Sequence, residues 1–559
     1  MNYRNEYEHW LADPAIDTAT KDELLKIASN EKEIEDRFYT HLAFGTAGMR
    51  GIIGAGTNRM NIYTVRKATQ GLANYILAQG TENKGVVIAY DCRNMSPEFC
   101  EEAALVLNGN GIPSYVFESL RPTPELSFAI RYLGCTAGIV ITASHNPPEY
   151  NGYKVYWDDG GQVPSPRDLD IIEEVNKVKD FSQINVAAKK SDLFRTAGSE
   201  VDNAYIKAVL NQRRHPDFYD EQLKIVFTPL HGTGNIPVRR VLSEAGYHNV
   251  YVVKEQAAPN GNFPTVTYPN PEDFSVLAMA EELAIEVDAD IMLCTDPDAD
   301  RMGVAVRIAK GKYMPFTGNM TGALLTEYLL SQGNLPENGV VISTIVSTNM
   351  TKSIVESYGL SYINVLTGFK YFGEKIKEFE QSGQYKYVFG FEESYGCLAG
   401  DYARDKDAVV AILLLCEAAA FYAKKGKTLW DVMCEAYKKY GFFKEATESI
   451  TLKGIDGLAD IRRIMANMRK NPPDKLCEYS VVEVKDYLDE IDGLPKSDVI
   501  YYVLDDGSWV CIRPSGTEPK IKLYFGTQVN KFGDVNEADL IATKKLDTLY
   551  DAVKQLVSA

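Results

Sequence analysis

One pattern occurs three times along the chain, and it narrows the possible folds more than any other feature. A short apolar segment typical of a buried strand leads into a polar turn, and about 45 to 70 residues later a second such segment ends in an unusually polar loop. The first segments are 84–89, 223–227 and 339–343, and the second segments with their loops are 138–148, 290–301 and 387–396. Amphipathic segments of helix length separate them, which favours α/β layers. We therefore predict three related α/β units that display these loops at the carboxyl ends of strands, where open α/β sheets bind ligands.

The two ends of the chain differ from these units. In residues 1–40 the apolar positions lie three or four apart, which predicts helices. After about residue 445, strand-like runs precede a helix from about Asn536, which predicts a smaller α+β domain. The 559 residues are enough for several domains. The boundaries that we expect give domains 1–200, 201–315, 316–440 and 441–559.

The composition excludes several classes of protein. With 59 Lys+Arg against 77 Asp+Glu, the formal net charge is −18, which disfavours nucleic acid or an anionic membrane as the main partner. The longest apolar run, 408–416, is too short to cross a bilayer and predicts a buried helix. The N-terminal segment lacks the apolar stretch of a signal peptide. The nine scattered cysteines are typical of buried, reduced thiols, so we expect a cytoplasmic protein.

The first polar loop, TASHNPP (142–148), holds Ser144 among small and polar residues. A serine hydroxyl is a weak nucleophile unless a base or a metal assists it, and an isolated loop serine is far more often a plain turn residue. His145 alone is likewise more often a packing or hydrogen-bonding residue. Lys154 follows within reach of the loop. Taken alone, the loop leaves a nucleophile, a phosphate carrier and a simple turn all open.

The second polar loop, DPDADR (296–301), carries Asp296, Asp298 and Asp300 directly after an apolar strand. Carboxylates this close repel one another unless a cation neutralises them, and hard oxygen ligands in a short loop favour Mg²⁺ or Ca²⁺. An EF-hand would need Gly and Glu where Arg301 and Arg307 stand, so that alternative fails. A solvated acidic turn is the other alternative, and the apolar strand before the loop disfavours it.

The third polar loop, GFEESYG (390–396), offers Glu392 and Ser394 as hydrogen-bonding partners for sugar hydroxyls. Upstream, the segment TGFK (367–370) adds a small-residue turn with a cation. Downstream, Arg404 and Lys406 precede the apolar helix. They can meet an anion or form an ordinary salt-bridged helix start.

Two further segments have the features of anion-binding loops. RPSGTEPK (513–520) combines the forked donor Arg513 with two hydroxyls and a glycine, as in a phosphate cradle, although a plain β-turn would use the same residues. FGTAGMRG (44–51) places three glycines around Arg50, which indicates close approach of backbone to a ligand. It lacks the GK[ST] ending of a P-loop, so the segment does not support nucleotide binding through a P-loop.

Each loop is ambiguous alone, but in the order TASHNPP, DPDADR, FEES and RPSGTEPK they resemble the α-D-phosphohexomutase superfamily. The resemblance runs from about Leu42 to the C-terminus, and GFEESY and ARDKDA are most similar to its phosphoglucomutase and phosphopentomutase branch. It implies three α/β domains and a smaller C-terminal α+β domain around a central cleft. Pro297 and Ala299 stand where many members have glycine, without changing the carboxylate spacing. Phe391 replaces another glycine, which leaves the identity of the sugar open.

The resemblance also implies roles for individual residues. Ser144 matches the phosphoserine that carries the transferable phosphate, and Asp296, Asp298 and Asp300 match the Mg²⁺ ligands, together with a phosphoserine oxygen. Charge-stabilising or proton-transferring groups are expected at Arg50, His145, Lys154 and Lys406, with the general base unassigned. The expected substrate contacts are Arg301, Thr367, Gly368, Lys370, Glu392, Ser394, Arg404, Arg513, Ser515, Gly516 and Thr517.

The reaction implied is the interconversion of glucose 1-phosphate and glucose 6-phosphate through glucose 1,6-bisphosphate, with Mg²⁺ as the cofactor. Phosphopentomutase or phosphomannomutase activity stays open, as do a Mg²⁺-dependent phosphatase and a catalytically silent sugar-phosphate-binding protein. A serine hydrolase is not supported, because TASHN lacks the GxSxG form of a nucleophile elbow. The expected partner is a small sugar phosphate, with no nucleic acid or membrane, and the sequence does not determine the oligomeric state.

Overall fold

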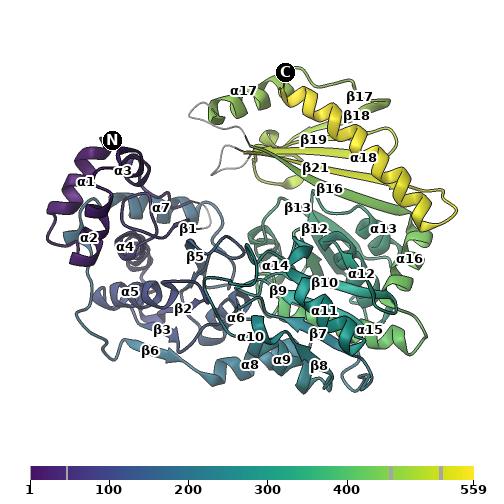
Figure 1. The fold of residues 1–559 in the computed structure, drawn as a ribbon, viewed down its shortest axis with the longest axis horizontal. Helices are drawn as coiled ribbons and strands as arrows, with labels where there is room; N and C mark the ends of the chain where they lie inside the picture. The colour runs from purple at the N-terminus through teal and green to yellow at the C-terminus, as the bar shows by residue number, and fades with distance from the viewer. Residues whose placement is uncertain (1, 46–47, 452–456, 515–519, 559) are drawn as a thin grey trace. The chain divides into compact units, whose positions relative to one another are not determined.

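The computed structural model describes residues 2–45, 48–451, 457–514 and 520–558 (Figure 1). The chain forms two compact units, each assembled from separate stretches of sequence. The first unit comprises Met1–Phe316, Phe369–Gly390 and Ser394–Gly426. The second comprises Thr317–Gly368, Phe391–Glu393 and Lys427–Ala559. Because the chain passes repeatedly between the units, each unit contains part of the polar loops described above.

The first unit begins with three short helices, α1 (Tyr3–Ala12), α2 (Thr18–Lys26) and α3 (Glu31–Phe38), as the spacing of apolar residues predicts. The side chains of Asn2, Asp17 and Asn30 accept hydrogen bonds from backbone amides at the three helix starts. Trp10 and Phe38 meet edge to face in a separate small core. The prediction of helices in residues 1–40 is confirmed.

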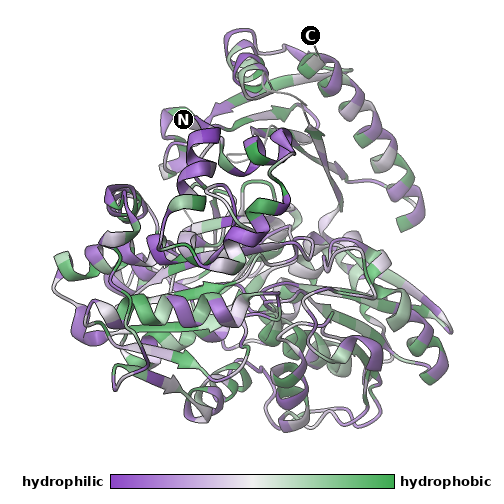
Figure 2. Ribbon diagram, turned by 60° about the vertical axis from the view of Figure 1, so that its left-hand side comes forward, coloured by the Kyte–Doolittle hydropathy of each residue, from purple (hydrophilic) through white to green (hydrophobic). Residues whose placement is uncertain are grey.

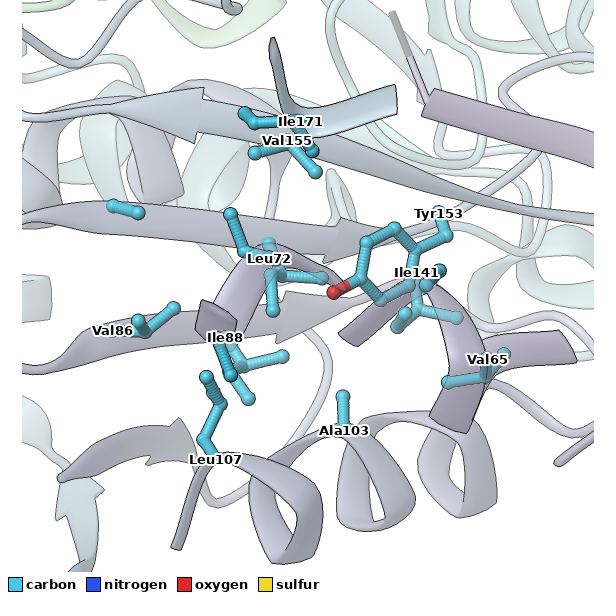
Figure 3. Packing of buried hydrophobic residues seen from close by; sticks show 14 of the residues in the cluster. Val65, Leu72, Val86, Ile88, Ala103, Leu107, Ile141, Tyr153, Val155 and Ile171 are labelled. Atoms are coloured by element: carbon cyan, nitrogen blue, oxygen red, sulfur yellow. The ribbon is translucent and has the colours of Figure 1, made fainter. Parts of the chain in front are cut away.

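The first large sheet has the strand order β1-β5-β4-β2-β3-β6. Its strands are β1 (Gly48–Ile52), β2 (Val86–Tyr90), β3 (Ser114–Phe117), β4 (Ala137–Ile141), β5 (Tyr150–Trp157) and β6 (Phe194–Ala197). The helices around it are α4 (Ile62–Gln79), α5 (Ser96–Gly109), α6 (Thr123–Leu133), α7 (Arg167–Lys177) and α8 (Ser199–Leu210). Figure 3 shows Val86, Ile88 and Ile141 of the sheet packed against Leu72 of α4 and Leu107 of α5. The first polar loop, residues 142–148, which we call the serine loop, follows β4 at the edge of this core.

The second sheet of the first unit has the order β11-β10-β9-β7-β8. Its strands are β7 (Ile225–Thr228), β8 (Val250–Val252), β9 (Ile291–Thr295), β10 (Met302–Ala309) and β11 (Lys312–Phe316), and its helices are α9 (Asn235–Glu244), α10 (Lys254–Ala257) and α11 (Ala278–Val287). In both sheets the two strands of the repeated pattern pair in parallel, Val86 with Ala137 and Ile225 with Ile291. The serine loop after β4 and the second polar loop after β9, residues 296–301, which we call the aspartate loop, therefore follow equivalent strands.

Four further elements lie between residues 370 and 423. They are α14 (Lys370–Ser382), β14 (Lys386–Phe391) and β15 (Cys397–Ala399), followed by α15 (Ala408–Ala423). Every residue of α15 from Ala408 to Ala420 is buried, including Glu417. The prediction of a buried helix at 408–416 is thus confirmed.

The second unit contains a parallel pair, β12 (Gly339–Thr344) and β13 (Ser361–Val365), with α12 (Gly318–Ser331), α13 (Met350–Ser357) and α16 (Leu429–Tyr440). Its large sheet is antiparallel, in the order β16-β21-β20-β19-β18-β17. The strands are β16 (Phe442–Thr451), β17 (Lys475–Leu476), β18 (Tyr479–Asp486), β19 (Ile500–Leu504), β20 (Trp509–Pro514) and β21 (Lys520–Val529). Apolar residues of α17 (Gly457–Lys470) and α18 (Val535–Ser558) pack on it. This is the smaller α+β domain that the sequence predicts.

The distribution of apolar residues follows this layering. In Figure 2 many strands are hydrophobic, whereas many helices carry a hydrophilic face. All nine cysteines are free thiols, and most are buried as expected, but Cys477 is exposed because it lies in the turn between β17 and β18. Within the described residues, no helix is both long and apolar enough to span a membrane. The α/β fold class is confirmed, and the exact domain boundaries stay predictions.

Candidate functional site

Ser144 lies in the loop after β4, in a backbone conformation that is rare for serine. Its φ is 52°, in the left-handed region, which costs about 1 to 2 kcal/mol for a residue with a Cβ. The Ser144 amide donates to the Thr142 hydroxyl oxygen at 2.8 Å, and the Ser144 hydroxyl donates to Asp296 Oδ2 at 2.9 Å. Strain of this kind persists only where surrounding contacts impose it. The structure thus brings together two loops that lie 152 residues apart in the sequence.

His145 is a candidate base beside Ser144. Its Nδ1 lies 3.2 Å from the Ser144 hydroxyl oxygen. Burial lowers the pKa of His145 well below its ordinary value, and the neighbouring charges of Arg301 and Arg50 lower it further. The imidazole is therefore neutral near pH 7, and a neutral ring nitrogen can accept a hydrogen bond or a proton.

The three aspartates form a buried cluster after β9. Asp296, Asp298 and Asp300 are at most 2% exposed, and one carboxylate oxygen from each lies within 4.8 Å of the others. Backbone amides of Asp300 and Arg301 donate to Asp296 Oδ1 at 3.1 and 3.0 Å. Among the described residues, Asp298 Oδ1 and Asp300 Oδ1 are buried without a hydrogen-bond partner. Buried acceptors of this kind fit a cation held by hard oxygen ligands, so the cluster can hold a metal ion.

Two ammonium groups face the carboxylates. Lys154 Nζ lies 3.0 Å from Asp298 Oδ2, and Lys406 Nζ lies 3.1 Å from Asp300 Oδ2. Burial acts to raise the pKa of Asp298, but the charge of Lys154 and hydrogen bonds outweigh it, so this pKa is lowered. The pKa of Asp296 is raised well above its ordinary value, by burial and then by the charges of Asp298 and Asp300. Lys406 Nζ also lies 3.2 Å from Asp405 Oδ1, so these two lysines do not by themselves neutralise the carboxylates of the cluster.

The position of Lys406 depends on a close approach of backbone. A Cβ at Gly396, at the end of the GFEESYG segment, would lie 2.0 Å from Lys406 Cδ. Nearby, the carbonyl oxygen of Tyr395 accepts a hydrogen bond from the Met302 amide of β10 at 3.0 Å. The half-buried Ser394 precedes this contact. The end of the third polar loop is thus fixed beside the aspartate loop within the first unit.

The remaining predicted cations of the first unit have different surroundings. Arg50 is exposed and donates to Asn146 Oδ1 at 3.1 Å, in the serine loop. Arg301 is paired with Glu272 at 2.6 Å, and Lys370 is half-buried at the start of α14. Arg404 is fully buried and bonds to Glu380 and to carbonyl oxygens of its own loop. In this conformation its guanidinium supports the loop, and its role in binding substrate stays a prediction.

The second unit contains the other predicted substrate contacts. The Gly368 amide donates to Glu392 Oε1 at 2.8 Å, and Glu392 is 4% exposed beside the half-buried Thr367. Arg513, at the end of β20, lies beside Tyr524, whose pKa is raised by burial and by Glu393 and lowered in part by Arg513. Ser515, Gly516 and Thr517 lie outside the described residues.

Two residues at the site were not predicted to act there. Thr123 begins α6, donates from its hydroxyl to Asp298 Oδ2 at 2.8 Å and from its amide to the Asp298 carbonyl oxygen at 2.9 Å. Arg93 donates to the backbone carbonyl oxygen of Ser144 at 2.6 Å. The polar turn DCRN after the strand at 84–89 is a signal for Arg93, whereas nothing local to Thr123 indicates a contact across 175 residues.

Comparison with known proteins agrees with this arrangement. Four successive segments match domains of the phosphoglucomutase/phosphomannomutase family. Residues 41–181, 203–309 and 317–440 match its alpha/beta/alpha domains I, II and III, and residues 458–531 match its C-terminal domain.

Curated relatives are similar over nearly the whole chain. A phosphoglucomutase of Staphylococcus aureus (strain MRSA252) is 39% identical over 521 residues, which cover 90% of this chain and 93% of the relative. A phosphoglucomutase of Staphylococcus epidermidis is 37% identical over 535 residues, covering 93% of this chain and 96% of the relative.

Solved structures show the same fold at lower identity. The open form of pp63/parafusin, a phosphoglucomutase from Paramecium, has a TM-score of 0.71 at 18% identity and covers 93% of this chain and 96% of its own. A putative phosphomannomutase from Thermus thermophilus has a TM-score of 0.67 at 22% identity, with 91% and 99% covered. Together with the four matched domains and the extent of the curated matches, these likenesses lead to one conclusion: the chain belongs to the phosphoglucomutase/phosphomannomutase family.

Proposed function

We propose that this protein is a phosphoglucomutase, an isomerase-class enzyme that interconverts glucose 1-phosphate and glucose 6-phosphate. The observation that carries the proposal is the placement of the strained, buried Ser144 hydroxyl 2.9 Å from Asp296, in a cluster of three aspartates and two lysines. That constellation suits a serine that carries a phosphoryl group. The curated relatives with the name phosphoglucomutase support the choice of glucose.

Ser144 would carry the transferable phosphoryl group. Phosphoserine bears nearly two negative charges near pH 7. It would give the phosphoryl group to the free hydroxyl of the sugar phosphate, which makes glucose 1,6-bisphosphate and leaves the serine hydroxyl. After the bisphosphate reorients, Ser144 would take back the other phosphoryl group. His145, Lys154, Lys406 and Arg50 are the candidates for moving the hydroxyl proton and for neutralising charge on the transferring group.

Asp296, Asp298 and Asp300 would hold Mg²⁺, with a phosphoserine oxygen as a further ligand. The metal ion would supply charge neutralisation at the transferring phosphoryl group. The unpartnered oxygens of Asp298 and Asp300 support this assignment. We also propose glucose 1,6-bisphosphate as the activator that phosphorylates Ser144.

The other predicted residues would bind the substrate. Glu392 and Ser394 would contact sugar hydroxyls, and Arg513 with Ser515–Thr517 would bind the phosphate that does not react. Arg301, Thr367, Gly368, Lys370 and Arg404 complete the proposed set. The partner would be a small sugar phosphate, with no nucleic acid or membrane, and the location would be the cytoplasm.

Phosphorus NMR tests the proposal. The purified protein is incubated with glucose 1-phosphate, Mg²⁺ and a trace of glucose 1,6-bisphosphate, and the expected result is a resonance of glucose 6-phosphate. Conversion of mannose or ribose phosphates but not of glucose phosphate would reject the glucose assignment, and release of free phosphate alone would reject the mutase. Ser144→Ala should abolish turnover, and near-wild-type turnover of that variant would remove Ser144 as the carrier.

A further inference from the structure

Arg93 is among the largest fully buried side chains of the protein, and the terminal nitrogens of its guanidinium donate hydrogen bonds to the segment 144–150. It lies in the turn after β2 and is 1% exposed. The four N–H groups of Nη1 and Nη2 have four acceptors, all backbone carbonyl oxygens at 2.5 to 3.0 Å. These acceptors belong to Ser144, Asn146, Pro147 and Tyr150. One side chain therefore binds four carbonyl oxygens in and next to the serine loop.

Asp91 holds Arg93 and the start of the loop at the same time. Its Oδ2 lies 3.3 Å from Arg93 Nε and accepts the Thr142 hydroxyl at 2.7 Å. Thr142 in turn accepts the Ser144 amide at 2.8 Å. The polar contacts thus form a closed chain from Arg93 through Asp91 and Thr142 to the backbone on both sides of the Ser144 side chain.

The segment 261–263, which lies between β8 and β9 of the second sheet, packs against the turn that contains Arg93. The Arg93 guanidinium carbon lies 5.1 Å from the centre of the Phe263 ring. A Cβ at Gly261 would lie 2.5 Å from the Asn94 amide nitrogen, so the backbones approach closely there. Asn94 also donates to Asn262 Oδ1 at 2.9 Å. The turn that holds the serine loop is therefore in contact with the part of the unit that carries the aspartates.

We propose that Arg93 is a positioning residue that sets the Ser144 hydroxyl against Asp296, by fixing the loop backbone with a guanidinium that itself packs on the Phe263 ring. This inference rests on the proposed function of Ser144 as phosphoryl carrier. The left-handed φ of Ser144 needs surrounding contacts to persist, and the four hydrogen bonds from Arg93 supply them. Lysine has three N–H groups on a single nitrogen and cannot reproduce a planar fork that reaches four carbonyl oxygens.

Arg93→Lys is the direct test, and Arg213→Lys is its matched control. Arg213 is also buried, bonds to Glu417 and to two carbonyl oxygens, and lies away from the serine loop. Turnover, urea unfolding and amide hydrogen exchange are measured on the full-length protein. For Arg93→Lys we expect kcat to fall about 10- to 100-fold with KM for glucose 1-phosphate nearly unchanged, since misplacement by about 1 Å can cost that much. Exchange should accelerate in residues 142–150 and not in β7.

Arg213→Lys should lower stability while keeping kcat within about twofold of wild type. Phe263→Leu, which retains Arg93, should lower kcat about threefold and accelerate exchange in the same segment. If Arg93→Lys does not fold, Phe263→Leu decides the question. The proposal would be overturned if Arg93→Lys, or Phe263→Leu where Arg93→Lys does not fold, keeps the kcat and the hydrogen exchange of the wild type. It would also be overturned if Arg213→Lys loses as much kcat as Arg93→Lys. If the wild-type protein shows no mutase activity, the proposed function fails. The positioning role of Arg93 is then tested by amide hydrogen exchange in residues 142–150 alone.

Discussion

Glu445 gives the clearest prediction of how stability depends on pH. It lies in β16, and its carboxyl group is enclosed next to Thr348 and Asn319 of the second unit, although the residue as a whole is half-buried. Asn319 is held there, because its side-chain oxygen accepts the Thr348 amide at 3.0 Å. Burial raises the pKa of Glu445 from 4.5 to about 7, and hydrogen bonds with Thr348 and Asn319 offset burial only in part.

The sign and size of the effect follow from this pKa. In the unfolded chain the carboxyl group ionises near pH 4.5, whereas in the folded protein it keeps its proton to about pH 7. The folded state therefore binds more protons between these values, and stability falls as pH rises through this window. At about 1.4 kcal/mol for each pH unit, the loss amounts to about 3 kcal/mol by pH 8.

Glu445→Gln removes the titrating group with little change of shape. Urea unfolding of both proteins is followed from pH 4.5 to pH 8.5, and the variant should gain about 3 kcal/mol relative to wild type across the range. Glu448→Gln, at an exposed site on the same strand, measures the background effect of losing a carboxylate. A Glu445→Gln difference that stays constant within about 0.5 kcal/mol, which is less than half the effect of one pH unit, would refute the reasoning.

Three further predictions concern the site. Asp298→Asn should reduce the thermal stabilisation that Mg²⁺ gives, because one of the unpartnered buried oxygens is lost, and an unchanged Mg²⁺ titration would remove Asp298 from the metal ligands. Thr123→Val removes the hydroxyl that bonds to Asp298 and should cost about 1 to 3 kcal/mol of stability in urea unfolding; a wild-type midpoint would contradict this. Arg513→Lys should chiefly raise KM, since the contact is lost in ground and transition states alike, and a pure kcat effect would argue against phosphate binding there.

The fold was largely predictable, because local patterns determine it. The strands at 84–89, 223–227 and 339–343 are found as β2, β7 and β12, and the apolar run at 408–416 is the middle of the buried helix α15. Strand and helix periods are readable from a few neighbouring residues, so they need no knowledge of distant contacts. The exposed Cys477 was predicted less well, because burial in a turn depends on what packs over it.

The site was predictable only as separate loops. That Ser144 and Asp296 form a hydrogen bond follows from the packing of two sheets, and no local pattern states it. Thr123 was missed for the same reason, since its partner is distant, and the DCRN turn indicates a polar role for Arg93 without showing which loop it binds. Arg404 shows the opposite case, a residue predicted to bind substrate that has protein partners in the structure. Its guanidinium bonds to the Glu380 carboxylate and to carbonyl oxygens of its own loop.

Net charge is equally uninformative about the site. The chain carries −18 overall, and at the site the carboxylates of Asp296, Asp298 and Asp300 lie beside the ammonium groups of Lys154 and Lys406, of which Lys406 also pairs with Asp405. The pKa of Asp296 is raised because a further negative charge is costly in this buried place beside Asp298 and Asp300. A divalent cation on the aspartates would add two positive charges to this balance, and Arg50, bonded to the serine loop, would add a further one nearby. If Ser144 carries a phosphoryl group as proposed, a metal ion on these carboxylates would offset its negative charge. We therefore expect binding of the metal ion and phosphorylation of Ser144 to favour one another.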